Sequence, residues 1–272
     1  MPELPEVETV KNVLKGKIVG RKILGVDVFY NLIKEPSKDE FVKLIKNQNI
    51  LDIKRRGKFL MFELDDYYLL SHLRMEGKYY IDGKITKHDH IVFHLNGFDL
   101  KYNDTRKFGR MYLIKKNLVY QKEPLNKLGL EPFDLNLNTK YLKQKYKNKK
   151  LSIKTLLLDQ SIITGIGNIY SDEILFLSKI NPLQKGSTLS DEQLNNIIIN
   201  TKLILKQAIK KGGTTIRSYE SEKGVHGTFQ NDLKVHNHEN EKCPICGGVI
   251  LKIKVNGRGT YFCSNCQRRK DG

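Results

Sequence analysis

The chain has 272 residues, 39% of them hydrophobic, which is enough for two modest domains and a smaller module held by other means. Its 48 Lys and Arg against 30 Asp and Glu give a formal net charge of +18, well beyond what solubility requires. This excess favours a polyanionic partner, although an A/T-rich coding bias toward Lys, Asn and Ile would contribute part of it. No secretory signal or membrane-spanning run is apparent, so we expect no membrane partner and a cytoplasmic location.

The chain begins Met1-Pro2-Glu3, and removal of Met1 would expose the secondary amine of a proline beside a carboxylate. Such an amine can attack an electrophilic sugar carbon and form an iminium. An α-amino group titrates near pH ~7.7–8.0 against ~10.4 for lysine, so much more of it is free base at neutrality. Glu3 could move protons next to it. The alternative is an ordinary helix start, because Pro5 and Glu6 both suit a first helical turn.

An apolar stripe of Val7, Val10 and Leu14 predicts that this first helix runs to Gly16, a plausible C-cap. From residue 22 to about 116 the pattern then becomes that of β-strands, which predicts an antiparallel sandwich or barrel. Turn residues between apolar runs mark two hairpins, residues 59–64 with 67–73 around Asp65-Asp66 and residues 90–95 with 98–102 around Asn96-Gly97.

The second half of the chain has helical periodicity. Gly165-Ile-Gly167-Asn168 separates two predicted helices, residues 153–160 and 169–179. Glycines at such a turn let backbone N–H groups approach a phosphate, and Asn168 can cap the second helix, although the same pattern is more often only a turn.

Two further features follow along the chain. Ser190 and Gln193 predict a capping box for a long helix that ends at Gly212-Gly213. The polar run at 217–229 then predicts a loop.

The four cysteines of the chain form two Cys-x-x-Cys pairs separated by sixteen residues, the spacing of a structural zinc site. Residues 249–262 between the pairs predict a β-hairpin that turns at Asn256-Gly257. Two disulfides are the alternative, but a cytosol keeps thiols reduced. We therefore expect one structural zinc ion per chain, with four ligands: Cys243, Cys246, Cys263 and Cys266.

These motifs occur in a fixed order that resembles bacterial formamidopyrimidine-DNA glycosylases from end to end. They are PELPEVETV, RRGKFL with Lys58, HLRMEG with Met75, NDTRKFG with Arg106 and Phe108, GIGNIYSDE with Asn168, GGTTIRSY and the four-cysteine end. The resemblance implies an α+β multidomain fold: an N-terminal antiparallel β-sandwich with a catalytic N-terminal helix (1–122), a helix-two-turns-helix domain (123–234) and a β-hairpin zinc finger (235–272).

The resemblance also implies the chemistry. Pro2 would be the Schiff-base nucleophile and Glu3 the proton donor, with Glu6 supporting the amine. Lys58 would assist β-elimination and Arg258 the second, δ-elimination. The expected enzyme is a bifunctional glycosylase and lyase that excises oxidised purines, 8-oxoguanine and formamidopyrimidines, from double-stranded DNA.

A base inside a duplex must be flipped out before its sugar carbon can be reached. The resemblance implies that Met75, Arg106 and Phe108 fill the space it leaves, although Met75 and Phe108 lie in β-like stretches where burial in the core is the simpler interpretation. Residues 217–229 would cover the flipped base. The resemblance places four further residues at the DNA backbone, namely His88, Lys150, Lys154 and Asn168.

One segment departs from the family pattern. Residues 235–242 read VHNHENEK where the family usually has an aromatic-Gly-Arg segment. His236 and His238 are alternative metal ligands, but four thiolates already complete the site. Two other functions stay open: an endonuclease VIII-type glycosylase for oxidised pyrimidines, and a non-catalytic zinc-ribbon protein that binds nucleic acid by charge. We expect a monomer, associated with the nucleoid while it acts.

Overall fold

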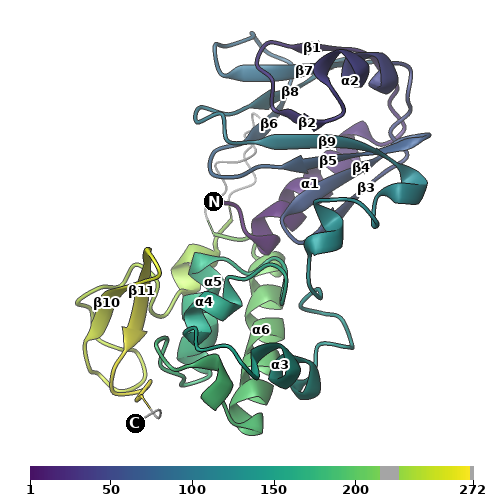
Figure 1. Cartoon of the computed structure of the whole chain (residues 1–272). Coiled ribbons are helices and arrows are strands. Elements are labelled where there is room, and N and C mark those ends of the chain that lie inside the picture. The colour runs from purple at the N-terminus through teal and green to yellow at the C-terminus, as the bar shows by residue number, and fades with distance from the viewer. Residues whose placement is uncertain (215–226, 270–272) are drawn as a thin grey trace. The chain divides into compact units, whose positions relative to one another are not determined.

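The computed structural model describes residues 1–214 and 227–269 (Figure 1). Residues 1–126 and the described part of 211–228 form one compact unit, and residues 127–210 with 229–269 form a second. Of the expected covering loop at 217–229, all but the last three residues lie outside the described part. Within the described ranges, no helix is both long and apolar enough to cross a membrane.

The first unit is built on two β-sheets. The five-stranded sheet has the order β2-β9-β5-β4-β3, with β2 parallel to β9 and the other neighbours antiparallel, and the four-stranded sheet has the order β1-β7-β8-β6. The strands are β1 (Ile23–Val28), β2 (Ile33–Glu35), β3 (Asp52–Arg56), β4 (Phe59–Glu63), β5 (Tyr67–His72), β6 (Lys78–Ile81), β7 (Asp89–Leu95), β8 (Asp99–Asn103) and β9 (Arg110–Lys115).

Apolar side chains from both sheets and from two helices form one core, which includes the fully buried Tyr79, Ile91 and Tyr102. Helix α1 (Leu4–Ile18) packs on β3 and β4, and α2 (Lys38–Ile45) packs on β1 and β2 (Figure 1). The antiparallel sandwich expected from the sequence is confirmed. Both predicted hairpins form, because β4 pairs with β5 and β7 with β8.

The prediction that the first helix ends at Gly16 is wrong by two residues, since α1 continues to Ile18. Ile18 is completely buried in the core. A glycine inside a helix costs roughly 0.5–1 kcal/mol relative to alanine, whereas burying an isoleucine side chain gains about 1.5–3 kcal/mol. Burial of Ile18 therefore outweighs the helix-breaking tendency of Gly16.

The second unit contains four α-helices and a β-hairpin in its described residues. These are α3 (Thr139–Tyr146), α4 (Ile153–Leu157), α5 (Asn168–Leu177), α6 (Asp191–Lys210), β10 (Ile250–Val255) and β11 (Arg258–Cys263). The predicted capping box is present, because the Gln193 N–H donates to Ser190 Oγ at 3.2 Å and the Ser190 N–H donates to Gln193 Oε1 at 3.0 Å. The predicted zinc-module hairpin also forms, and its turn places Asn256 and Gly257 at positive φ, 45° and 74°.

Short 3₁₀ turns complete the described chain, η1 (Lys116–Leu118), η2 (Leu125–Lys127), η3 (Gly186–Thr188) and η4 (Phe229–Asp232). Within the second unit, α5 packs on α4, α6 and β11 (Figure 1). A small apolar cluster joins Phe176 of α5 to Ile250 and Tyr261 of the hairpin. The helices therefore fix the position of the hairpin within this unit.

Candidate active site, DNA-contacting loops and zinc centre

The first candidate site lies at the N-terminal end of α1. Pro2 and Glu3 are buried there, and Glu3 is the N-cap residue of the helix. The Glu3 N–H donates to Glu6 Oε2 at 2.9 Å, while Glu6 Oε1 accepts from Thr214 N at 2.9 Å and Thr214 Oγ1 at 3.1 Å. One buried carboxylate therefore joins the start of α1 to the GGTT segment, more than two hundred residues further along the chain.

Lys58 lies in the turn between β3 and β4, the two strands on which α1 packs. Arg55 fixes this turn, because its Nε donates to Glu8 Oε2 of α1 at 2.7 Å and its Nη1 donates to the Gly57 carbonyl at 2.9 Å. Lys58 itself is only 5% exposed. The Arg55–Glu8 contact thus ties the turn that carries the predicted lysine to the helix that follows Pro2 and Glu3.

A histidine that the sequence did not single out lies next to this lysine. His72 ends β5 and pairs with Phe59, the neighbour of Lys58. Burial first, and then the positive charges of Arg74, Lys58 and Arg110, together lower the pKa of His72 to about 3. Its Nδ1 accepts the Arg74 N–H at 3.0 Å, so the neutral ring carries its proton on Nε2. His72 therefore stays uncharged beside the basic groups of the site.

Two neighbouring loops carry the three residues expected to enter the duplex. The loop after β5 holds Met75, and the loop before β9 holds Arg106 and Phe108. Because β5 pairs with β9, these loops leave the sheet at the same end. Met75 is 37% and Phe108 50% exposed, so neither side chain belongs to the core, and the Arg106 guanidinium lies 4.8 Å from the Phe108 ring centre.

A buried tyrosine supports both loops. The hydroxyl of Tyr102 lies against Gly77 and Gly109, the glycines at the ends of the two loops, where an added Cβ would approach it to 2.2 Å and 2.0 Å. This Tyr102 oxygen has no hydrogen-bond partner among the described residues. Glycine at these positions is what allows the two loops to close over the ring.

The predicted backbone contact His88 is next to the second of these loops. The Asp104 N–H donates to the His88 carbonyl at 3.0 Å, and the Asp104 carboxylate accepts from the N–H groups of Arg106 and Gly109 at 3.0 Å and 2.7 Å. Asp104 is completely buried. It therefore fixes the loop that carries Arg106 relative to His88.

The second unit holds the other predicted DNA-contacting residues. Lys150 is exposed, in the segment between α3 and α4. Asn168 is the first residue of α5 and not its cap, because Gly167 takes the cap position. The Asn168 Nδ2 donates to the Gly259 carbonyl of β11 at 2.9 Å. The expectation that Asn168 caps the helix is thus wrong, and its amide instead joins the helix to the hairpin.

Lys154 does not fit the expected contact with the DNA backbone. Its side chain is fully buried, and Nζ donates to Asp172 Oδ1 at 2.5 Å, to Ser171 Oγ at 2.7 Å and to the Asn168 carbonyl at 3.0 Å. A phosphate outside the protein cannot reach an ammonium group that is buried and already bonded in this way. The direct contact predicted for Lys154 is therefore corrected to a role inside the protein.

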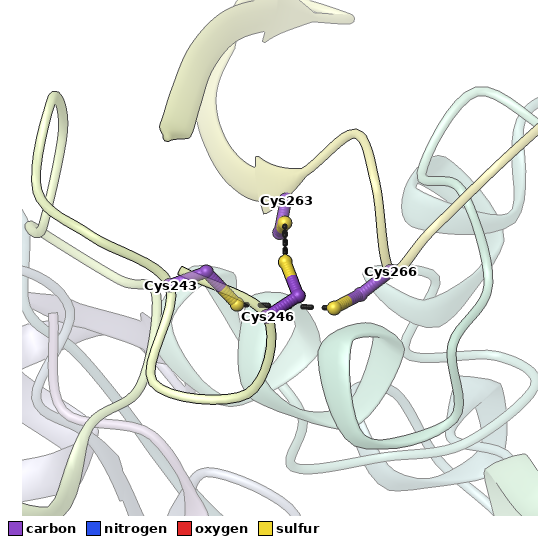
Figure 2. Close-up of side chains that lie close together, drawn as sticks. All are labelled: Cys243, Cys246, Cys263 and Cys266. Atoms are coloured by element: carbon purple, nitrogen blue, oxygen red, sulfur yellow. Dashed lines mark hydrogen bonds between the residues drawn. The ribbon is translucent and has the colours of Figure 1, made fainter. Parts of the chain in front are cut away.

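The four cysteines converge on one point (Figure 2). All their sulfur atoms lie within 4.8 Å of one another, with Sγ–Sγ distances of 3.8 Å for Cys243 and Cys266 and 3.5 Å for Cys246 and Cys263. Zn–S bonds of about 2.3 Å in a tetrahedron require sulfur atoms roughly 3.8 Å apart. His236 and His238, the alternative ligands, do not belong to this cluster.

The chemistry of these thiols also fits a zinc ion. A hydrogen bond from the Gly248 backbone lowers the pKa of the Cys246 thiol to about 7, whereas burial raises the pKa of Cys263. A central cation would favour the thiolate form of all four. Four sulfur ligands complete a tetrahedral shell, so the site serves the structure and leaves no position for a substrate.

Comparison with known proteins follows the same division of the chain. Residues 1–111 match the formamidopyrimidine-DNA glycosylase N-terminal domain, residues 128–220 the H2TH domain of that family, and residues 240–269 a zinc finger found in FPG and IleRS. A formamidopyrimidine-DNA glycosylase of Oceanobacillus iheyensis is 48% identical, with 100% of this chain and 99% of the relative covered.

The fold is similar to solved structures of an FPG from Lactococcus lactis. A mutant of that protein in complex with a Fapy-dG containing DNA has a TM-score of 0.92 and 40% identity, covering 98% of this chain and 100% of the other. The wild-type protein in complex with an oxidised pyrimidine containing DNA has a TM-score of 0.90 and 40% identity at the same coverage. The likeness therefore extends over both compact units.

Proposed function

Because the chain belongs to the formamidopyrimidine-DNA glycosylase family, we propose that it excises oxidised purines from double-stranded DNA and cleaves the strand at the resulting abasic site. One observation carries the chemistry: the buried start of α1, where Glu6 holds the backbone of Glu3 and where the turn with Lys58 is fixed against the same helix. This arrangement supports a nucleophile at Pro2.

The first steps need Met1 to be removed, so that the Pro2 nitrogen has a lone pair. That nitrogen forms a bond to C1′ of the damaged nucleotide, and the glycosidic bond breaks as the base leaves with its electron pair. The base takes up a proton, and the nitrogen loses its own. Glu3 gives a proton to O4′ as the C1′–O4′ bond opens, which leaves an iminium between Pro2 and C1′. Glu6 accepts the Glu3 N–H and so positions the N-terminal residues around the sugar.

The iminium then acts as an electron sink for two eliminations. Loss of a proton from C2′, assisted by Lys58, expels the 3′ phosphate. In the second elimination, loss of the proton from C4′ expels the 5′ phosphate, which Arg258 of the zinc hairpin holds. Water then hydrolyses the iminium and releases the sugar fragment from Pro2. The strand is left with a gap of one nucleoside.

The remaining predicted residues serve recognition. Met75, Arg106 and Phe108 enter the space left by the flipped nucleotide, and their exposure on two adjoining loops supports this role. His88, Lys150 and Asn168 hold the DNA backbone. The chain works as a monomer with three functional parts, residues 1–122, 123–234 and 235–272, and acts on the DNA of the bacterial nucleoid.

A second substrate class has one observation in its favour, since the similar Lactococcus lactis protein has been solved with an oxidised pyrimidine containing DNA. Borohydride trapping separates the possibilities, because it reduces the iminium to a stable covalent adduct. We expect an adduct with a duplex that contains 8-oxoguanine opposite cytosine, and none when Met1 is retained.

The outcomes of this trapping experiment are distinct. A weaker adduct in Pro2→Gly would support the N-terminal amine as nucleophile. Trapping of oxidised pyrimidines alone would assign the chain to the endonuclease VIII type. Binding without any adduct would indicate a non-catalytic DNA-binding protein and would contradict the proposed mechanism.

A further inference from the structure

The segment that departs from the family pattern, residues 235–242, is anchored in the second unit by two consecutive carboxylates of α5. Glu173 accepts the backbone N–H groups of Lys234, Val235 and His236, at 2.9, 3.0 and 2.9 Å. His236 is only 7% exposed. The chain is thus held firmly at the histidine that precedes the zinc site.

The imidazole of His236 completes a buried polar network. Its Nδ1 lies 2.7 Å from Asp172 Oδ2, and the other oxygen of Asp172 accepts from Lys154 at 2.5 Å. Both Asp172 and Lys154 have side chains with 0% exposure. A carboxylate in the interior needs such partners, because an uncompensated one costs several kcal/mol. The network therefore depends on the nitrogen that His236 presents.

Residues of this network also contact strand β11 of the hairpin. The His236 ring packs edge-on against Tyr261 of β11, with centroids 4.9 Å apart. Two residues before Tyr261 in the same strand, the Gly259 carbonyl accepts from Asn168, whose own carbonyl accepts from Lys154. Thus α4, α5 and the segment before the zinc site hold β11 at two places.

Arg258 is the first residue of β11, next to Gly259. An isolated two-stranded hairpin is marginally stable, so contacts outside it must set its orientation. The cysteine site fixes only the end of β11 at Cys263. Beyond that end, Asn168 contacts β11 at Gly259 and His236 contacts it at Tyr261, between the cysteine site and the arginine.

We propose that His236 is a positioning residue for Arg258: through its hydrogen bond to Asp172 and its packing on Tyr261, it holds β11 where Arg258 can bind the phosphate lost in the second elimination. This inference rests on the proposed function. It also gives buried Lys154 a part in the same network.

The test is the ratio of products from a duplex with a single abasic site. β-elimination alone leaves an unsaturated aldehyde on the 3′ end, whereas both eliminations leave a phosphate, and the two strands separate on a denaturing gel. His236→Phe keeps a ring against Tyr261 but loses the donor to Asp172. We expect its ratio of δ to β product to fall about tenfold, because misplacement of a catalytic group by about 1 Å has effects of this order or larger.

Matched variants distinguish positioning from general damage. His236→Asn places an amide donor near the Nδ1 position, so most of the wild-type ratio should return. His238→Phe changes the histidine two residues further on, whose side chain pairs with Glu241 at the surface, and should leave the ratio unchanged. Borohydride trapping, which reports on Pro2, should stay within about twofold of wild type in all three variants, and zinc content should be equal.

Each result decides the matter. A wild-type ratio in His236→Phe, or a fall in trapping that matches the fall in δ product, would overturn the inference. Partial unfolding would lower both products together and leave their ratio unchanged. If His236→Phe yields no zinc-loaded protein, His236→Gln replaces it in the comparison, because its longer side chain misplaces the amide. Wild-type protein that neither cuts nor traps would instead refute the proposed function.

Discussion

At the scale of single residues, Gly213 is a constrained position next to the Glu6 carboxylate of the candidate active site. It has φ of 81°, and an added Cβ would lie 2.5 Å from Glu6 Oε1. Gly213→Ala should therefore displace the Glu6 carboxylate from Glu3 and Thr214. We expect borohydride trapping to slow by roughly tenfold or more, since placement of a reacting group to about 1 Å matters. Single-turnover trapping on an 8-oxoguanine duplex measures this.

Gly16→Ala is the matched control for this substitution. Gly16 is exposed inside α1, and no atom lies within 4 Å of its added Cβ. Alanine there should raise the free energy of unfolding by about 0.5–1 kcal/mol and leave trapping unchanged. Equal trapping rates for Gly213→Ala and wild type would show that the position of Glu6 does not matter to the reaction.

His72 predicts a specific dependence of stability on pH. Its folded pKa of about 3 lies below the ordinary value of 6.5, so the unfolded state binds a proton that the folded state rejects. The stability that neutral His72 contributes is complete above pH ~6.5 and is lost as pH falls toward 3, at up to about 1.4 kcal/mol per pH unit. Denaturant unfolding between pH 7 and pH 4 measures this slope.

His72→Asn should remove this dependence, because an amide oxygen can still accept the Arg74 N–H but does not titrate. His94 should behave in the opposite way. Hydrogen bonds to Asp99 and Asp27 raise its pKa, so its contribution is present at low pH and is lost as pH rises through that raised value. A slope in His72→Asn equal to that of wild type would contradict the assignment to His72.

At the scale of elements, the two loops at the shared end of β5 and β9 predict that base flipping can be impaired separately from strand cleavage. Phe108→Ala removes an exposed ring from one of them. Excision of 8-oxoguanine should fall about tenfold, because the unstacked space in the duplex is no longer filled. Cleavage at a preformed abasic site should change much less, since no base has to be flipped. Comparing the two duplexes in single turnover gives the answer.

Leu135→Ala serves as the control for an exposed apolar side chain, because Leu135 is 92% exposed and lies outside these loops. It should leave both reactions unchanged. If Phe108→Ala slowed both substrates equally, the loop would contribute to binding or chemistry and would not act in base flipping.

Local elements could be predicted from the sequence because their signals are local. Asn256-Gly257 specifies a tight turn by its own backbone preferences, and Ser190 with Gln193 specifies a helix start within four residues. The motif residues of the site, such as Lys58, could be found only through their resemblance to a family. Their environment could not be predicted, because Glu8, the partner of the Arg55 that fixes the turn, lies 47 residues away on α1.

Lys154 shows where reading the sequence fails. Its partner Asp172 is 18 residues away and His236 is 64 residues from that aspartate, so no periodicity or spacing reveals the network. A lysine is usually exposed, but this one lies where α4 packs on α5 and is buried. His72 was not predicted for the same reason, since no residue near it in the sequence indicates that it will be uncharged beside Lys58.

At the scale of the whole molecule, the net charge of +18 makes DNA binding depend on salt. Each phosphate neutralised by a lysine or arginine contributes about −0.9 to the slope of log affinity against log salt concentration. The total charge overstates this slope, because lysines such as Lys54 and Lys154 are already paired within the protein. Removal of an exposed lysine should therefore change the salt slope, whereas removal of a buried, paired lysine should change the free energy of unfolding.

Lys150 and Lys154 are only four residues apart and make this difference measurable. Lys150 is exposed, so Lys150→Gln should reduce the magnitude of the salt slope by about 1 and leave thermal stability unchanged. Lys154→Met should leave the slope of the folded protein unchanged but lower the free energy of unfolding by about 3–5 kcal/mol, because the buried Asp172 loses its cation. Fluorescence anisotropy of a labelled duplex over a salt series, together with thermal unfolding, measures both quantities. If Lys154→Met had normal stability and a reduced salt slope, Lys154 would contact a DNA phosphate directly, contrary to what its burial indicates.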